Sequence, residues 1–483
     1  MRSKLNKLAS NKILKYMFSR YFTYAIQFLN SVMIAVKLGP YYFGIWGFIL
    51  LLLNYFRIID FGISNATNIL IVQNRDDRTQ LSPISSNAIY LVSAVNFIVI
   101  IFCCYYYFVG SAFFDKYSVN AFIWYILIVA VITNYNVLFM NLYRVQNSLK
   151  EISLFQSMVP LIMFVITFFF TGKELLDYLI FANVFGGFIS FIIFIKNGKI
   201  PKLVKCNIEI CKIIMNKGFY LFIYSISFYL IILSIKTLIS IYYSVNEFGL
   251  FSFSYTLGNS VLLFLQALTF IVFPKIIDKL KGTDFNVIRS TLNSIRISYV
   301  SMAFGLVFAV LMLFPFLLGF IPKYKDSFST LSLVMLTVVL YTNSFGYGTF
   351  LMAQNFERIN ALISFLSLVV NVLLALFLIL FLRVQYQYVI LATIGSYILY
   401  TFLCVYFGKR KMNLKEGFLK DFEDCFPLRL LVPFVIAIVF IFLDLKYYML
   451  IPFLVFMLFN LRSLREIGKK IRILLNKPNV VDL

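Results

Sequence analysis

Residues 43–48 read Phe-Gly-Ile-Trp-Gly-Phe, and residues 248–253, which lie 205 positions later, read Phe-Gly-Leu-Phe-Ser-Phe. A second pair of similar segments, QNSLK at 146–150 and QNFER at 354–358, recurs at an offset of 208. One short match is weak evidence in so apolar a sequence, but two matches at nearly the same offset indicate an internal repeat. The sequence therefore predicts a chain built from two similar halves.

The rest of the chain is too apolar for a protein that folds in water. Of its 483 residues, 61% are apolar and 13% are charged, whereas soluble chains are about half apolar and a quarter charged. A helix needs roughly 20 mainly apolar residues to cross a bilayer. Fourteen candidate stretches lie near residues 16–36, 44–66, 84–109, 121–143, 152–171, 176–195, 218–243, 249–273, 297–318, 329–352, 359–382, 387–408, 428–444 and 446–461. Only Asp444 and Lys446 separate the last two, so a tight hairpin or one broken segment stays open there. We therefore expect an all-α integral membrane protein with about fourteen transmembrane helices.

Lysine and arginine side chains orient these helices. If the N-terminus is cytoplasmic, the cytoplasmic segments hold 33 of the 43 basic residues and the opposite side holds 7. This asymmetry is the one expected when basic loops stay inside. It predicts a multi-pass protein of the bacterial inner (plasma) membrane with both termini in the cytoplasm. The net charge of +23 is thus explained by topology before any nucleic-acid partner is considered.

Six predicted helices separate the repeated motifs, so the two halves have the same orientation. We expect two parallel six-helix lobes, an architecture in which transporters bind substrate between the halves and alternate access across the membrane. The expected parts are an N-terminal lobe (1–197), a basic linker (198–217), a C-terminal lobe (218–408), a basic loop (409–427), helices 13 and 14 (428–461) and a basic tail (462–483). The basic loop and tail are expected to contact anionic membrane lipids.

Three basic residues fall inside predicted spans, where a charge costs a few kcal/mol and needs a reason. They are Arg20, Arg57 and Lys236. We predict that they line a cationic cavity that binds an anionic substrate. Other polar residues on the same helices are expected to line this cavity, namely Tyr24, Gln27, Ser31, Asn54, Tyr255, Asn259 and Gln266. Two structural alternatives stay open. Long basic side chains can reach the headgroups, and Asp60 can neutralise Arg57, three residues earlier, or pair with Arg20.

Catalytic and metal-binding patterns are missing from the sequence. It contains no histidine, and its six cysteines follow no ligand spacing. No phosphate-binding glycine loop or zinc-protease motif occurs. We expect a transporter without a catalytic motif, a metal site or a cofactor.

The aromatic motif at residues 43–48 is part of a longer pattern. Residues 38–48 (LGPYYFGIWGF) resemble the L-G-P-x-x-[FY]-G motif of Wzx-type polysaccharide flippases, which transport O-antigen and capsule units. Residues 60–65 (DFGISN) and the tenth-helix end at 352–358 (MAQNFER) are similar to the same family. That family belongs to the multidrug/oligosaccharidyl-lipid/polysaccharide exporter superfamily.

This resemblance implies a flippase that moves undecaprenyl-diphosphate-linked oligosaccharide units from the inner to the outer leaflet by alternating access. It also implies a polysaccharide polymerase and chain-length machinery as partners, and coupling of transport to an ion or to the membrane potential. Asp60 is the only carboxylate well inside a predicted span, so we take it as the candidate for binding H+ or Na+.

Three other functions stay open as alternatives. A peptidoglycan lipid-precursor flippase shares fourteen helices and basic cavity residues. A cation-coupled multidrug exporter of the same superfamily tends to use cavity carboxylates, which this sequence lacks apart from Asp60. A membrane polysaccharide polymerase usually has a large external loop with arginines, and none of the predicted external loops exceeds about twelve residues.

Overall fold

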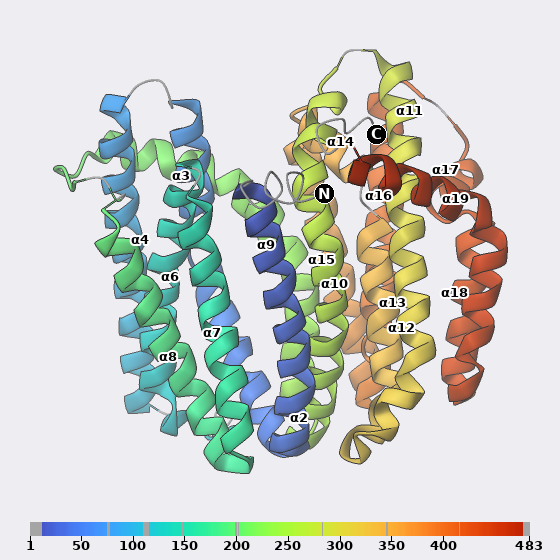
Figure 1. Ribbon diagram of the computed structural model, residues 1–483, viewed down its shortest axis with the longest axis horizontal. Helices are drawn as coiled ribbons and strands as arrows, with labels where there is room; N and C mark the ends of the chain where they lie inside the picture. Colours follow the sequence, from blue (N-terminus) through green and yellow to red (C-terminus); the bar gives the residue numbers. More distant parts are fainter. Residues whose placement is uncertain are drawn as a thin grey trace. The chain divides into compact units, whose positions relative to one another are not determined.

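The computed structural model describes residues 12–74, 78–109, 115–146, 148–198, 200, 202–282, 284–343, 346–414 and 416–476. In this part of the chain every regular element is a helix (Figure 1). Helices are suited to a lipid environment because each satisfies its backbone N–H and C=O groups internally. The expected all-α fold class is thus confirmed.

The chain divides into two compact units, Met1–Ile226 with Tyr243–Phe253 and Ser227–Tyr242 with Ser254–Leu483. Helices α9 (Ile208–Tyr242) and α10 (Val245–Leu280) each contribute to both units. The other helices of the first unit are α2 (Lys12–Ile58), α3 (Ile63–Gln73), α4 (Arg78–Val109), η1 (Val119–Ala121), α6 (Ile123–Val145), α7 (Leu149–Phe169) and α8 (Gly172–Lys196). Those of the second unit are α11 (Phe285–Ile295), η2 (Arg296–Val300), α12 (Ser301–Gly319), η3 (Pro322–Ser327), α13 (Phe328–Asn343), α14 (Tyr347–Ala353), α15 (Glu357–Leu376), η4 (Phe377–Phe381), η5 (Tyr386–Tyr388), α16 (Leu391–Lys411), α17 (Phe418–Cys425), α18 (Leu428–Phe442), η6 (Lys446–Met449) and α19 (Leu450–Asn476).

Within the described residues, nine helices are long and apolar enough to cross a membrane. The number rises to eleven if two bent helix pairs, one ending with α14 and one made of α17 and α18, each form one span. The predicted stretches fall largely on helices, but the count of fourteen crossings stays a prediction. One reason for the difference is that α2 counts as a single helix although it holds two predicted spans.

The break inside α2 lies at Gly39, four residues before the first copy of the repeated aromatic motif (43–48). Gly39 has φ 72° and ψ 168°, a conformation that other residues rarely adopt. Pro40 follows it and begins the next helical segment, a position where the missing proline N–H has no cost. The Gly-Pro pair therefore ends one predicted span and starts the next.

The two copies of the repeated aromatic motif pack against each other in the first unit. A Cβ atom placed on Gly249 would lie 1.9 Å from the carbonyl oxygen of Pro40, and one placed on Gly44 would lie 2.2 Å from that of Val245. Phe48 packs edge-to-face on Phe248, with 6.3 Å between ring centroids. Each copy thus needs its glycine because the backbone of the other copy occupies the space of a side chain.

The second repeated segment lies between corresponding helices in both halves. Helix α6 ends at Val145 and α7 begins at Leu149, while α14 ends at Ala353 and α15 begins at Glu357, 208 residues later. In the second copy, Gln354 donates hydrogen bonds from Nε2 to the carbonyl oxygens of Leu280 (2.7 Å) and Gly282 (2.9 Å) at the end of α10. Asn147 of the first copy lies outside the described residues.

The core of the first unit lies where α3, α4, α6 and α8 meet. Leu138, Tyr143 and Phe194 are fully buried there. The Tyr143 hydroxyl donates a hydrogen bond to the Phe194 carbonyl oxygen at 2.5 Å, and Asn141 Nδ2 donates one to the Ser64 carbonyl oxygen at 3.3 Å. These bonds fix α6, the helix that lines the pocket described below.

Candidate functional site

Lys236 is a buried cation in the second unit. It lies on α9 with only 7% of its surface exposed. Its Nζ atom lies 3.7 Å from the centroid of the Tyr255 ring on α10, and no ion pair or hydrogen bond of this side chain is found in the described part of the chain. A cation over an aromatic face gains up to about 2 kcal/mol when desolvated, whereas removing an ammonium from water costs several kcal/mol. The Lys236 ammonium is thus only partly compensated.

An aromatic cluster lies around Phe228, about two turns before Lys236 on α9. The Phe228 ring lies 5.1 Å from that of Tyr341 on α13, and 5.6 and 4.8 Å from those of Tyr397 and Tyr400 on α16. Such rings offer a broad apolar face together with a polar hydroxyl. Of the other predicted lining residues in this unit, Asn259 is half-buried on α10, and the side chain of Gln266 lies outside the described residues.

Arg20 in the first unit is held by its own helix. Its Nη2 atom donates a hydrogen bond to the Tyr24 hydroxyl at 2.6 Å, and its guanidinium carbon lies 4.5 Å from that ring centroid. Gln27 is half-buried one turn later. Ser31 is buried and donates to the carbonyl oxygen of Phe28 at 2.7 Å. Arg20 and Tyr24, both predicted to line the cavity, are thus bonded to each other, while Ser31 satisfies its hydroxyl locally, and the cavity role of these residues stays a prediction.

Arg57 lines a pocket of about 160 Å³ in the same unit. The pocket is bounded by three helices of this unit, α2, α6 and α8. Its lining residues are Leu50, Leu53, Asn54, Arg57, Val129, Ala130, Thr133, Asn134 and Asn183. Arg57 is exposed and Asn54 is half-buried. Both line this one pocket, and their role in binding substrate stays a prediction.

Asp60 occupies the break between α2 and α3. Its Oδ2 accepts a hydrogen bond from the Ser64 backbone N–H at 3.1 Å, and its Oδ1 accepts one from the Ser64 hydroxyl at 3.2 Å. A carboxylate is favoured at a helix N-terminus by these donors and by the helix dipole. No ion pair joins Asp60 to Arg57 or Arg20 in the described residues, so direct neutralisation is not the arrangement seen. The role of Asp60 in ion coupling stays a prediction.

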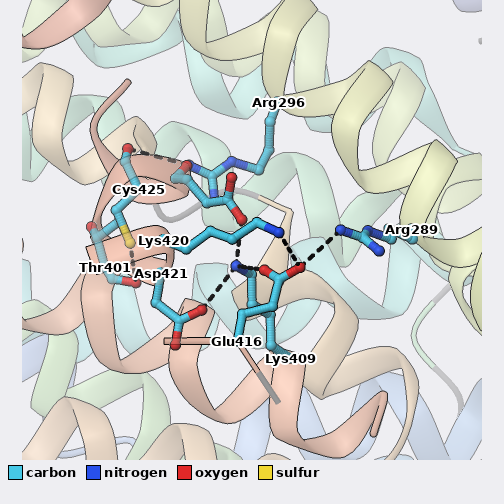
Figure 2. A network of polar contacts seen from close by, with 9 residues as sticks. Arg289, Arg296, Thr401, Lys409, Glu416, Lys420, Asp421 and Cys425 are labelled. Atoms are coloured by element: carbon cyan, nitrogen blue, oxygen red, sulfur yellow. Dashed lines mark hydrogen bonds and ion pairs between the residues drawn. The ribbon is translucent and has the colours of Figure 1, made fainter. Parts of the chain in front are cut away.

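The densest charge cluster of the described chain lies in the second unit, apart from Lys236. Each of its charged side chains forms an ion pair (Figure 2). The Lys409 ammonium on α16 is 2% exposed and forms ion pairs with Glu416 (2.5 Å), Asp421 (2.8 Å) and Asp424. Glu416 also pairs with Arg289 of α11 and with Lys420, both at 3.1 Å. The basic 409–427 loop was expected to contact lipid, but the Lys409 side chain does not. Three carboxylates, from α17 and the loop before it, enclose this side chain.

This cluster predicts an acid-sensitive contribution to stability. The hydrogen bond from Lys409 holds the pKa of Glu416 at about 2, well below its usual value of 4.5. A lowered folded-state pKa stabilises the protein above the unfolded-state pKa, and the contribution is lost as pH falls from about 4.5 toward 2. We expect Glu416→Gln to lower the free energy of unfolding by about 1–2 kcal/mol at pH 7, with a smaller difference at pH 3. Thermal unfolding of both proteins at the two pH values measures this, and an equal difference at both would contradict it.

Comparison with known proteins places this geometry in context. Residues 10–278 match the family described as polysaccharide biosynthesis protein. The chain belongs to this family. No curated protein sequence matches the chain.

Solved structures show the fold of this family member. The structure titled "Lipid II flippase MurJ, inward closed conformation" is 13% identical, with a TM-score of 0.69, and the match covers 95% of this chain and 99% of that one. An inward-facing multidrug resistance transporter of the MATE family in the MOP superfamily has a TM-score of 0.64 at 12% identity, covering 82% and 98%. A MOP superfamily transporter from Pyrococcus furiosus, titled as having a binding pocket of reverse polarity, has a TM-score of 0.53 at 11% identity, covering 83% and 95%. The chain is thus a multi-pass membrane protein with the all-helical fold of flippases and exporters.

Sequence reasoning missed the amides that complete the Arg57 pocket. Asn134 and Asn183 lie near the middle of α6 and α8, and Thr133 adjoins the first. The predictions from the sequence rest on charges inside the spans, whereas a buried amide at mid-span also has to be satisfied inside the membrane. The signal was therefore present as polar residues at the centres of two predicted helices.

Proposed function

We propose that this protein moves undecaprenyl-diphosphate-linked oligosaccharide units from the inner to the outer leaflet of the bacterial inner membrane, for assembly of surface polysaccharides such as O-antigen or capsule. The proposal joins the polysaccharide family membership to one structural observation. That observation is the Lys236 ammonium, buried on the Tyr255 ring without a carboxylate partner in the described chain.

An incompletely compensated cation in a transporter is suited to an anionic substrate. A diphosphate brings the negative charge that Lys236 lacks, and a charge-assisted hydrogen bond between them is about twice as strong as a neutral one. In the first unit, Arg20 and Arg57 are candidates for binding other negative groups of the transported unit. In alternating access, these cations lower the cost of moving the charged headgroup away from water while the polyprenyl chain stays in lipid.

Aromatic side chains near Lys236 support a sugar-bearing headgroup. In the cluster of Phe228, Tyr341, Tyr397 and Tyr400, the Tyr341 side chain is exposed, and the buried Tyr397 and Tyr400 pack with it around Phe228. Faces of this kind pack on the apolar side of a sugar ring, and the hydroxyls accept or donate hydrogen bonds. A polymerase and chain-length machinery would then receive the flipped units on the outer side.

A second candidate is flipping of a peptidoglycan lipid precursor. It is favoured by the match to the lipid II flippase structure, which covers 95% of this chain and 99% of that one. The multidrug transporter structures cover only 82–83% of this chain while nearly all of their own length is matched. That difference in length, together with cationic rather than acidic candidate residues, argues against drug export.

Reconstitution in liposomes tests the proposal and ranks the candidates. We expect a fluorescent undecaprenyl-diphosphate oligosaccharide to become accessible to an external quencher at least about tenfold faster with the protein than without it. The same measurement with a lipid-linked muropeptide, and with a cationic dye, gives the comparison. Faster movement of the muropeptide would favour the second candidate, and movement of the dye alone would refute both flippase functions.

Liposomes with a proton or sodium gradient identify the coupling ion. Loss of the gradient dependence of flipping in Asp60→Asn would assign the binding of that ion to Asp60.

A further inference from the structure

The pocket beside Arg57 is lined by residues near the middle of two helices of the first unit. Asn134 is eleven residues from each end of α6, and Asn183 is eleven residues from the start of α8. At 1.5 Å per residue, both lie about 16 Å from a helix end. The pocket volume of about 160 Å³ is roughly five times the 30 Å³ that a water molecule occupies in liquid. It offers room for one sugar ring at about the middle of these spans.

The polar groups of the pocket have a particular balance. Of its nine lining residues, one is cationic, none is acidic, three are asparagines and one is a threonine. A metal ion or an organic cation would meet the Arg57 guanidinium there and no carboxylate among the lining residues. One guanidinium fork matches one carboxylate in two parallel hydrogen bonds. A diphosphate, with two to three negative charges, would leave most of its charge uncompensated.

The amides supply matching sites for hydroxyl groups. Asn134 is 3% exposed, and its Nδ2 donates to the Asn96 side-chain oxygen at 2.8 Å. Asn183 Nδ2 donates to the carbonyl oxygen of Leu179 at 2.9 Å. Both amides are thus oriented by the protein, and each keeps a side-chain oxygen that can accept a bond from a hydroxyl. Asn54 and Thr133 add donors and acceptors on the facing helices.

We infer that this pocket is a subsite for one acidic sugar of the transported oligosaccharide, a hexuronate-like ring whose carboxylate meets Arg57 and whose hydroxyls meet the amides. The inference rests on the proposed function and narrows its substrate class to units that contain an acidic sugar. It assigns the sugar carboxylate to Arg57, and the diphosphate is bound outside this pocket.

Binding of small probes to the full-length protein tests the subsite directly. Saturation-transfer NMR on the protein in nanodiscs would compare D-glucuronate, D-glucose and inorganic phosphate. We expect glucuronate to bind at least about tenfold more tightly than glucose, because only the acid forms the paired bonds to the guanidinium. Equal binding of glucose would refute the acid selectivity, and displacement of glucuronate by equimolar phosphate would reassign the pocket to the diphosphate.

Variants locate the binding. Arg57→Gln should reduce glucuronate affinity to that of glucose, and Arg57→Lys should restore it only in part, because an ammonium lacks the planar fork. Asn183→Asp, which places a negative charge in the pocket, should abolish glucuronate binding but not glucose binding. Lys173→Gln, on the exposed first turn of α8, is the matched control and should bind as the unaltered protein does. Unchanged glucuronate binding in both Arg57→Gln and Asn183→Asp would place the sugar elsewhere and overturn the inference.

Flipping assays separate this inference from the proposed function. Lipid-linked oligosaccharides with and without a uronic acid would be compared in liposomes. Arg57→Gln should slow flipping of the acidic unit about tenfold and that of the neutral unit less. Equal slowing of both would remove the subsite and leave the flippase function standing. If the unaltered protein moves neither lipid, the proposed function fails, whatever the probe-binding result.

Discussion

Replacing Lys236 with glutamine should reduce flipping of a lipid-linked oligosaccharide at least about tenfold without lowering the melting temperature of the protein. The two expectations have one cause. The ammonium is 7% exposed and lies over the Tyr255 ring. The free-energy cost of removing its charge from water is therefore larger than the stabilisation that the cation–π contact provides. Glutamine removes that cost, yet it also removes the positive charge that compensates an anionic headgroup. A loss of transport together with unchanged or raised stability is therefore the signature of a binding role.

Two further variants distinguish the charge from the ring. Lys236→Arg keeps a cation and should retain part of the flipping rate. Tyr255→Phe keeps the aromatic face and should stay within about threefold of the unaltered protein, whereas Tyr255→Leu removes the cation–π contact and should fall between it and Lys236→Gln. Scanning fluorimetry measures stability, and the liposome assay measures transport. A destabilised Lys236→Gln protein with a normal flipping rate would show that the lysine is structural.

The membrane fold could be predicted from the sequence because hydropathy and basic loops act locally. A run of apolar residues must be helical in lipid wherever it lies in the chain. The repeat was visible for a similar reason, since the turn after α6 and the turn after α14 use the same Gln-Asn sequence. The number of crossings was harder to predict because α2 contains two predicted spans joined at Gly39, and α13 and α14 form one bent pair.

Side-chain partners depend on contacts that no local pattern contains. The loop around Lys409 reads as a basic, lipid-facing segment, because its neighbours in the chain are basic. In the fold, Asp421 and Asp424 lie on a helix that packs back on α16, and they enclose the lysine. The Arg57 pocket shows the converse case. Asn54 and Arg57 were predicted to share a cavity, but Asn134 and Asn183 join them only through the packing of α6 and α8.

Replacing Gly249 with alanine should prevent correct folding or destabilise the protein by at least about 3 kcal/mol, the upper range for overpacked interiors. The new Cβ would lie 1.9 Å from the Pro40 carbonyl oxygen, 2.9 Å from its carbonyl carbon and 3.0 Å from the Gly44 nitrogen. All three are backbone atoms, so no side chain can rotate to relieve the clash. The start of α10 would have to move away from α2.

Gly319→Ala is the matched control for this prediction. A Cβ at Gly319 meets no atom within 4 Å, and alanine is favoured over glycine in a helix by about 1 kcal/mol. Size-exclusion profiles and melting temperatures of the purified proteins should therefore show loss for Gly249→Ala and no loss for Gly319→Ala. Gly44→Ala should resemble Gly249→Ala, because its Cβ would lie 2.2 Å from the Val245 carbonyl oxygen. A Gly249→Ala protein with normal stability would contradict the close backbone contact, and the shared glycine of the two motifs would then need another explanation.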